Sequence, residues 1–183
     1  MPTIIAHAIV GATVTTLRPR GVSPVKLAVA AAALAVLPDI DVLGFRYGIA
    51  YADALGHRGF THSLLFAALA AVAVATILFR DLEPRSPEFR RVTGILFVAT
   101  ASHGVLDAFT NAGLGVGFLI PFDDTRYFWP WRPLVASPLS VSRFIDGSGA
   151  GILINELKWI GLPALAFAIA ALGLRRWRRS RLR

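Results

Sequence analysis

The chain contains no cysteine and carries few charged residues for its length of 183 residues. Without cysteine it can form neither disulfide bonds nor thiolate metal ligands, so a bound metal would have to be held by nitrogen and oxygen atoms. Only 16% of the residues are charged, whereas a soluble domain carries about 25%. Together with 55% hydrophobic residues and a mean hydropathy of +0.61, this composition predicts one compact integral membrane protein.

The hydrophobic residues are concentrated in five long segments rich in Ala, Leu, Val and Ile. Their length and lack of regular alternation favour helices over strands. The stretch 110–151 is rich in Gly, Pro and aromatic residues and is predicted to be a long loop. We therefore expect an all-α integral membrane bundle of about five apolar helices with a long extracytoplasmic loop, forming a single membrane-embedded domain over 1–174. The five segments are 3–17, 24–37, 62–79, 92–109 and 152–174.

Basic residues cluster beside the ends of the apolar segments. Three clusters hold 13 of the 19 lysines and arginines: one near 18–26, one over 80–91, and one in the tail 175–183. Positive loops next to membrane helices are typical of the cytoplasmic side. This distribution predicts a multi-pass protein of the inner (plasma) membrane with an outward N-terminus and a basic cytoplasmic tail. It favours membrane lipid over nucleic acid as the partner, and nucleic-acid binding by the tail is the less favoured alternative.

All four histidines lie in short motifs that also contain carboxylates or hydroxyls. His57 and His62 belong to HRGFTHS, and His103 belongs to SHGVLD. Imidazole and carboxylate together are the ligands of Zn, Mn and Fe sites. In the topology derived from the basic residues, every one of these motifs falls on the extracytoplasmic side. The histidine motifs therefore predict a metal site at that face of the membrane.

Two motifs place carboxylates at the ends of predicted helices. His103 and Asp107 are four residues apart and share one helix face, so they could hold one ion; the alternative is a helix-terminal hydrogen bond between them. Asp39 and Asp41, in LPDIDVL, follow a helix whose dipole disfavours negative charge at its C-terminus. A cation would explain them, and turn chemistry at Pro-Asp is the alternative.

The remaining candidates are less specific. The five-residue spacing of His57 and His62 fits a loop ligand followed by one at a helix start, while surface histidines at a helix cap are the alternative. Arg58 between them could bind a phosphate. His7 stands alone in an apolar segment, where a packing role and a ligand role are both open.

These motifs together resemble the membrane-bound metal-dependent hydrolases of the YdjM-like family, which includes LexA-regulated inner-membrane members. The likeness runs over roughly residues 1–135, and HRGFTHS is its most specific part. The chain is also similar, more weakly, to the all-helical zinc phospholipase C and P1-nuclease group, whose members are soluble and use more histidines. The family resemblance implies a multi-helix membrane hydrolase whose metal site comprises His7, Asp39, Asp41, His57, His62, His103 and Asp107.

We therefore expect a divalent-metal-dependent hydrolase that acts on a lipid-linked or membrane-proximal phosphoester at the extracytoplasmic face. Zn is the first choice of metal, Mn and Fe are alternatives, and one to three ions are expected. Asp39 or Asp41 would act as base, and Arg58 would neutralise the phosphate. The rival hypothesis is a non-enzymatic metal-binding membrane protein, either a transporter or a sensor, although a transporter would place its ligands near the bilayer midplane.

Overall fold

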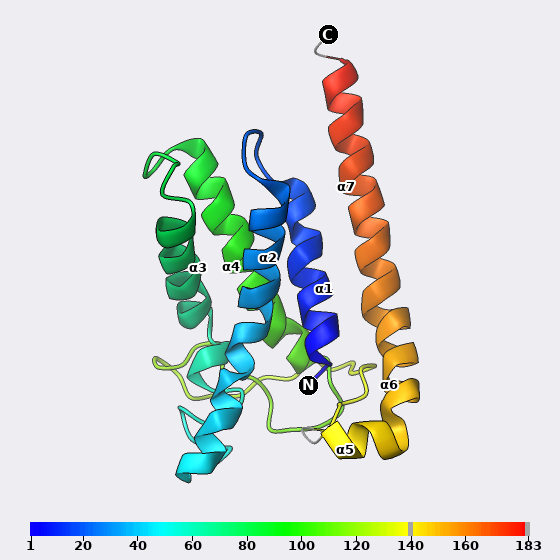
Figure 1. The fold of residues 1–183 in the computed structure, drawn as a ribbon. Coiled ribbons are helices and arrows are strands. Elements are labelled where there is room, and N and C mark those ends of the chain that lie inside the picture. The colour runs from blue at the N-terminus through cyan, green and yellow to red at the C-terminus, as the bar shows by residue number, and fades with distance from the viewer. Residues whose placement is uncertain (139–140, 182–183) are drawn as a thin grey trace.

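The structure is a computed structural model that describes residues 1–138 and 141–181, and within those ranges it is helical without named strands. Figure 1 shows a bundle of helices with one long helix standing beside it. The predicted all-α class is confirmed. The bundle consists of α1 (Ile4–Val14), α2 (Pro24–Val36), α3 (Leu64–Leu78) and α4 (Pro87–Ala108), with the short 3-10 segments η1 (Thr15–Leu17), η2 (Leu37–Tyr47) and η3 (Phe60–His62).

Hydroxyl side chains determine where the four bundle helices begin. Thr3, Ser23, Ser63 and Ser86 each accept a hydrogen bond from a backbone N–H in the first turn of the helix that follows. These bonds satisfy one of the orphan amides at each helix start. Proline also occupies the first helical position of α2 and α4. Its missing backbone N–H costs nothing there, because an N–H at that position has no partner within the helix.

Small residues allow the first two helices to pack closely. A Cβ atom at Gly11 of α1 would lie 2.6 Å from the carbonyl oxygen of Ala31 and from the Cβ of Ala35, both in α2. Small residues at such crossings let membrane helices approach until their backbones touch. The close contact fixes the position of His7, one turn before Gly11, relative to the end of α2.

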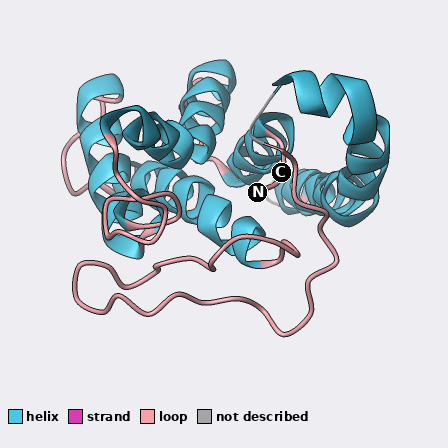
Figure 2. Ribbon diagram, turned by 90° about the horizontal axis from the view of Figure 1, so that it is seen from below, coloured by secondary structure: helices cyan, strands magenta, loops and turns pink. Residues whose placement is uncertain are grey.

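The C-terminal part forms an almost continuous helix outside the bundle, as Figures 1 and 2 show. It consists of α5 (Val141–Arg143), the π-turn η4 (Phe144–Ser148), α6 (Gly149–Glu156), the π-turn η5 (Leu157–Gly161) and α7 (Leu162–Ser180). The predicted loop 110–151 is therefore wrong over its last part, since helix begins at Val141. The sequence from 141 to 151 contains three glycines and several polar residues, so it lacks the apolar run that indicates a membrane helix.

Among the described residues, two helices are long and apolar enough to cross a membrane, Pro24–Tyr47 and Gly149–Arg178. The first of these helices combines α2 with η2, and η2 contains Pro38. Two further apolar helices, Ile4–Leu17 and Leu64–Leu78, are shorter. A full crossing needs about 20 residues, so the bundle of five membrane-spanning helices stays a prediction.

The two ends of the molecule differ in charge. Figure 1 shows the α1–α2 loop, the α3–α4 loop and the C-terminal end of α7 at one end, and the N-terminus, η2 and the long loop at the other. The three basic clusters lie in the first group, although Arg183 lies outside the described residues. This common location is what the positive-inside rule requires of cytoplasmic segments.

Cysteine labelling tests the orientation, because the chain has no native cysteine. Asp124→Cys in the long loop and Ser180→Cys at the end of α7 replace exposed residues at opposite ends of the molecule. In right-side-out vesicles, a membrane-impermeant maleimide should modify the cysteine at 124 at once and the one at 180 only after permeabilisation. The reverse pattern would invert the topology.

Candidate metal centre

All seven predicted ligand residues gather at the end of the bundle opposite the basic loops. His7 comes from α1, Asp39 and Asp41 from η2, and His103 and Asp107 from α4. His57 and His62 come from the turn before α3. The stacked rings of His7 and His103 have centroids 3.7 Å apart, and His62 contacts both His103 and His57, with centroid distances of 4.7 and 5.6 Å. Segments distant in the sequence therefore form one cluster.

Two carboxylates connect the histidines. Asp107 Oδ1 lies 3.5 Å from His7 Nε2, and Asp107 Oδ2 lies 3.7 Å from His62 Nε2. Asp39 Oδ1 lies 3.3 Å from His103 Nε2 and 3.8 Å from His62 Nε2. These N···O distances exceed those of ordinary hydrogen bonds. Two ligands of one tetrahedral Zn ion, each at about 2.0–2.2 Å from the metal, would lie about 3.3–3.6 Å apart, so the spacing fits a shared cation.

The same atoms have no hydrogen-bond partners. Within residues 1–138 and 141–181, Thr16 Oγ1 is the one buried side-chain atom outside the cluster that shares this property. Buried polar groups are normally satisfied, so nine unsatisfied atoms in one cluster require an explanation such as a bound ion. The nine are both ring nitrogens of His7, both oxygens of Asp39 and of Asp107, Nε2 of His62 and of His103, and Nε of Arg58, which is paired with Asp107 by charge alone.

Asp41 occupies a different position, behind the histidines. Its carboxylate accepts hydrogen bonds from His57 Nδ1 at 2.7 Å, from the Thr61 hydroxyl at 2.7 Å and from the Arg58 backbone N–H at 3.1 Å. His62 Nδ1 lies 3.1 Å from the same carboxylate. A carboxylate bonded to Nδ1 orients an imidazole and leaves Nε2 for a metal. The geometry thus favours an orienting role for Asp41 over the predicted roles of ligand and base.

His103 is oriented in a similar way by the backbone. Its Nδ1 lies 2.7 Å from the carbonyl oxygen of Ala35, near the end of α2. The carbonyl can only accept, so Nδ1 donates and Nε2 faces Asp39 as an acceptor. The crossing of α2 and α4 therefore determines which nitrogen of His103 is available to an ion.

Arg58 is almost fully buried and holds Asp107 in place. Its Nε lies 2.8 Å from Asp107 Oδ2, while Nη1 and Nη2 donate to the Ala112 carbonyl and the Thr110 hydroxyl, each at 2.9 Å. Its backbone φ of 64° lies in the left-handed region, which costs free energy for a residue with a side chain. These contacts support a positioning role. The predicted role in phosphate binding stays untested, and the guanidinium points at protein groups.

Arg126, in the long loop, contacts the turn that carries His57. Its Nη1 donates to the His57 carbonyl at 3.0 Å and its Nη2 donates to the Asp53 carbonyl at 2.9 Å. The loop therefore clamps the turn that carries His57. Partial burial lowers the pKa of the Arg126 guanidinium, and burial raises the pKa of Tyr51, whose ring packs edge-on against His57. No local motif signals this clamp, because its acceptors are backbone carbonyls.

The cluster divides into two groups that could each hold a metal ion: His7, His103 and Asp107, and Asp39, His57 and His62. The three carboxylates outnumber the guanidinium of Arg58, and the buried amino group of Met1 interacts with Asp39 and Asp107 as a second cation. An uncompensated buried charge is strongly destabilising. With neutral histidines, a divalent cation would offset the remaining negative charge, so the residues present fit such an ion in donor type, spacing and sign of charge.

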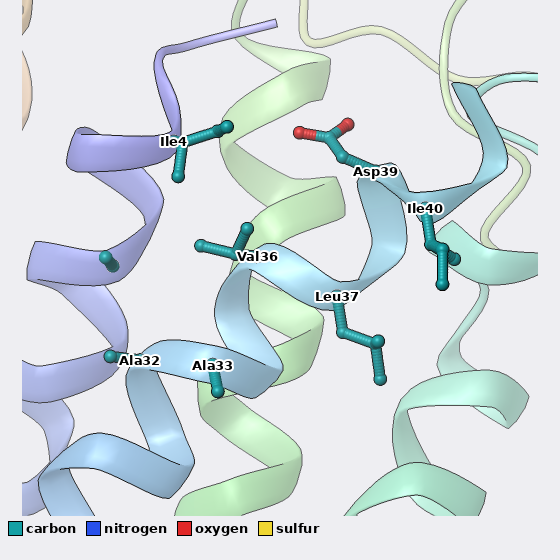
Figure 3. Close-up of a pocket in the computed structure, with 8 residues that line it drawn as sticks. Ile4, Ala32, Ala33, Val36, Leu37, Asp39 and Ile40 are labelled. Atoms are coloured by element: carbon teal, nitrogen blue, oxygen red, sulfur yellow. The ribbon is translucent and has the colours of Figure 1, made fainter. Parts of the chain in front are cut away.

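Access to the cluster runs past Asp39. Its side chain is 9% exposed and lines two cavities, one of about 630 Å³ between α1 and α2 and one of about 480 Å³ beneath the N-terminal residues. Figure 3 shows the Asp39 carboxylate at one end of the first cavity, beside Ile4. The group formed by His7, His103 and Asp107 is fully buried. The group formed by Asp39, His57 and His62 is therefore the less buried of the two.

An all-helical protein with long apolar helices and a buried cluster of His, Asp and Arg at one end defines a helical membrane protein with a candidate metal centre. The chain belongs to the YdjM inner membrane protein family, whose model matches residues 1–182. It is 40% identical, over 182 residues, to the inner membrane protein YbcI of Escherichia coli (strain K12), covering 98% of this chain and 99% of the relative. No solved structure matches the chain significantly.

The family membership confirms the resemblance seen in the sequence and places the protein in the inner membrane. The names of the family and of the relative state a location and no activity. The hydrolase activity, the metal and the substrate therefore stay predictions.

Metal binding is expected to stabilise the protein. Because the unfolded chain lacks the site, Zn or Mn at 100 times its Kd should raise the free energy of unfolding by about 2.7 kcal/mol. Thermal unfolding in detergent and elemental analysis measure both the shift and the stoichiometry. His103→Gln should abolish the shift, whereas Asp123→Asn in the exposed loop should preserve it. Equal shifts in both variants would place the ion elsewhere.

Replacement of Asp41 tests its orienting role. Asp41→Asn retains the size of the side chain but weakens the acceptor for two histidines, so metal affinity should fall by about 10- to 100-fold with the stoichiometry unchanged. Competition titration with a chromogenic chelator measures both values. Loss of a stoichiometric equivalent of metal would instead make Asp41 a direct ligand.

Proposed function

We propose that the protein is a divalent-metal-dependent hydrolase that acts on a lipid-linked or membrane-proximal phosphoester at the extracytoplasmic face. The observation that carries this proposal is the cluster of nine buried polar atoms without hydrogen-bond partners at the end of a membrane-protein bundle. Buried ionisable groups in such proteins are costly and usually serve function.

The ion would be held by His7, His62, His103 and Asp107, which leaves Asp39 free of the metal. A divalent ion supplies Lewis-acid chemistry, since it polarises a phosphoryl oxygen and activates water as a nucleophile. The nitrogen and oxygen donors suit Zn, Mn and Fe. The excess of carboxylates over cations suits one resident ion.

Asp39 is the favoured base. Both its oxygens lack hydrogen-bond partners, and the residue lines both cavities. Asp41, the other predicted candidate, accepts bonds on both oxygens and is buried behind His57. A general base must reach the proton it removes, so position favours Asp39. Arg58 supports the reaction by holding Asp107, which in turn contacts His7 and His62.

The location of the cluster supports a membrane substrate. The cluster lies at the end of the bundle opposite the basic loops. The cavity between α1 and α2 that reaches Asp39 is otherwise lined by Ala, Ile, Leu and Val. A phosphoester group at headgroup depth could meet the site while its apolar part stays in the bilayer.

A non-enzymatic metal-binding protein, a transporter or a sensor, is the second candidate. The full burial of His7, His103 and Asp107 favours it, because a structural or sensory ion needs no contact with substrate. Clustering at one end of the helices argues against a transporter, whose sites lie near the midplane. Turnover distinguishes the two candidates.

Asp39→Asn is expected to lower hydrolysis by about 100-fold or more, because the amide cannot accept a proton. Release of the phosphate-bearing headgroup from phospholipids in mixed micelles, with added Zn or Mn, measures the loss. A chelator should abolish the wild-type activity and added metal should restore it. Asp124→Asn, exposed in the long loop, is the control and should retain full activity.

One result would contradict the proposed hydrolase activity. In it, metal-loaded wild type and Asp39→Asn show the same background rate across phospholipids, polyprenyl phosphates and simple phosphodiesters. In that case the protein is not a phosphoester hydrolase, and the metal-binding alternative replaces the proposal.

A further inference from the structure

We infer that the cavity between α1 and α2 is a binding groove for one acyl chain of a membrane phospholipid, and that the alanines facing it determine whether a lipid reaches Asp39. This inference rests on the proposed function for its catalytic consequence, but the groove itself can be tested without turnover. Its residues are Ile4 and Ala8 of α1, Ala32, Ala33 and Val36 of α2, and Leu37 and Ile40 of η2, with Asp39 at its end.

The groove lies beside the place where α1 and α2 pack most closely. Gly11 brings α1 against Ala31 and Ala35. An open surface groove of about 630 Å³ is lined there by Ala8, Ala32 and Ala33, whose side chains are short. In Figure 3, Ile4 and Val36 extend towards each other across this space.

The position of Asp39 indicates what the groove receives. Its side chain is 9% exposed, both oxygens lack partners, and it is the one polar residue among those lining the groove. A groove that is apolar along its length and polar at one end matches a molecule with a hydrocarbon chain attached to a polar group. A phospholipid bound with its chain along α2 would place its phosphoester end beside Asp39, where a divalent ion held by the cluster would offset the repulsion between phosphate and carboxylate.

The surroundings make a lipid chain the natural occupant. The neighbouring outer residues Ile5, Ile9, Val25 and Val29 are all exposed and apolar, and this face belongs to a membrane protein. From Ala32 to Asp39 the chain rises about 10 Å at 1.5 Å per residue, so the groove extends from the site towards the interior of the bilayer. Since lipid surrounds the groove on its open side, a chain is held there by close packing rather than by the hydrophobic effect.

Photo-crosslinking tests the groove without any reaction at the site. The protein is placed in nanodiscs of phosphatidylglycerol that contain a trace of phospholipid with a diazirine in the acyl chain. After irradiation, lipid adducts on peptides from α1 and α2 should exceed those on α3 by about tenfold, as preferential binding of one chain predicts. Equal labelling of α3, whose Val72 and Ile77 are also exposed, would mean ordinary boundary lipid and would overturn the inference.

Filling the groove provides the matched comparison. Ala32→Phe should reduce the adducts in α1 and α2 by about tenfold, whereas Ala73→Phe, on the exposed face of α3, should leave them unchanged. Ala32→Leu and Ala8→Leu, which add less volume, should give intermediate losses and guard against misfolding of the larger variant. Adducts that persist in all groove variants, or that form with a diazirine polyprenyl phosphate and not with the phospholipid, would overturn the assignment to an acyl chain.

A hydrolysis assay separates this inference from the proposed function. Ala32→Phe should lower kcat/KM for a long-chain phospholipid by about tenfold relative to kcat/KM for a water-soluble p-nitrophenyl phosphodiester. Selective adducts without hydrolysis would retain the groove and overturn the hydrolase. Hydrolysis that Ala32→Phe lowers equally for both substrates, without selective adducts, would retain the hydrolase and overturn the groove.

Discussion

Carboxylates buried between helices are the constraint on which the rest of this structure depends. Asp39, Asp41 and Asp107 face histidines and Arg58, and the buried amino group of Met1 interacts with Asp39 and Asp107. A cluster of this kind is stable only when its charge is balanced and its donors and acceptors are satisfied. The helix ends, the turn before α3 and the long loop all converge on it. A cation at this place would link the architecture to the proposed chemistry.

The cluster consists of groups that face its centre and groups that hold them from behind. Asp41, the Ala35 carbonyl and Thr110 belong to the second kind, because each bonds to a histidine or to Arg58. Arg126 adds a further layer by holding the turn of His57 through backbone carbonyls. Supporting contacts of this type fix the tautomer and direction of each ligand. The contact of Arg126 explains why the long loop packs directly against the site.

The charge distribution of the whole molecule agrees with the position of the cluster. The basic loops and the end of α7 occupy one end, and the acidic and histidine residues occupy the other. The cavity along α2 connects this polar end with the apolar flank of the bundle. Membership of an inner membrane protein family gives that flank its natural surroundings, a lipid bilayer. A phosphoester carried by a lipid is the class of substrate that can meet both regions at once.

Composition and local spacing by themselves determined the membrane class, the all-α fold, the apolar segments and the seven candidate ligands. Each of these depends on hydrophobicity or on chemistry within a few residues, as in the i, i+4 pair His103 and Asp107. Only the tertiary structure decided which of two neighbouring carboxylates faces the site. Asp39 and Asp41 are equivalent in LPDIDVL, but a 3-10 turn directs one at the cavity and the other at His57. The clamp of Arg126 and the helix after Val141 were likewise beyond local reasoning, because backbone acceptors and packing partners from distant segments leave no pattern in the sequence.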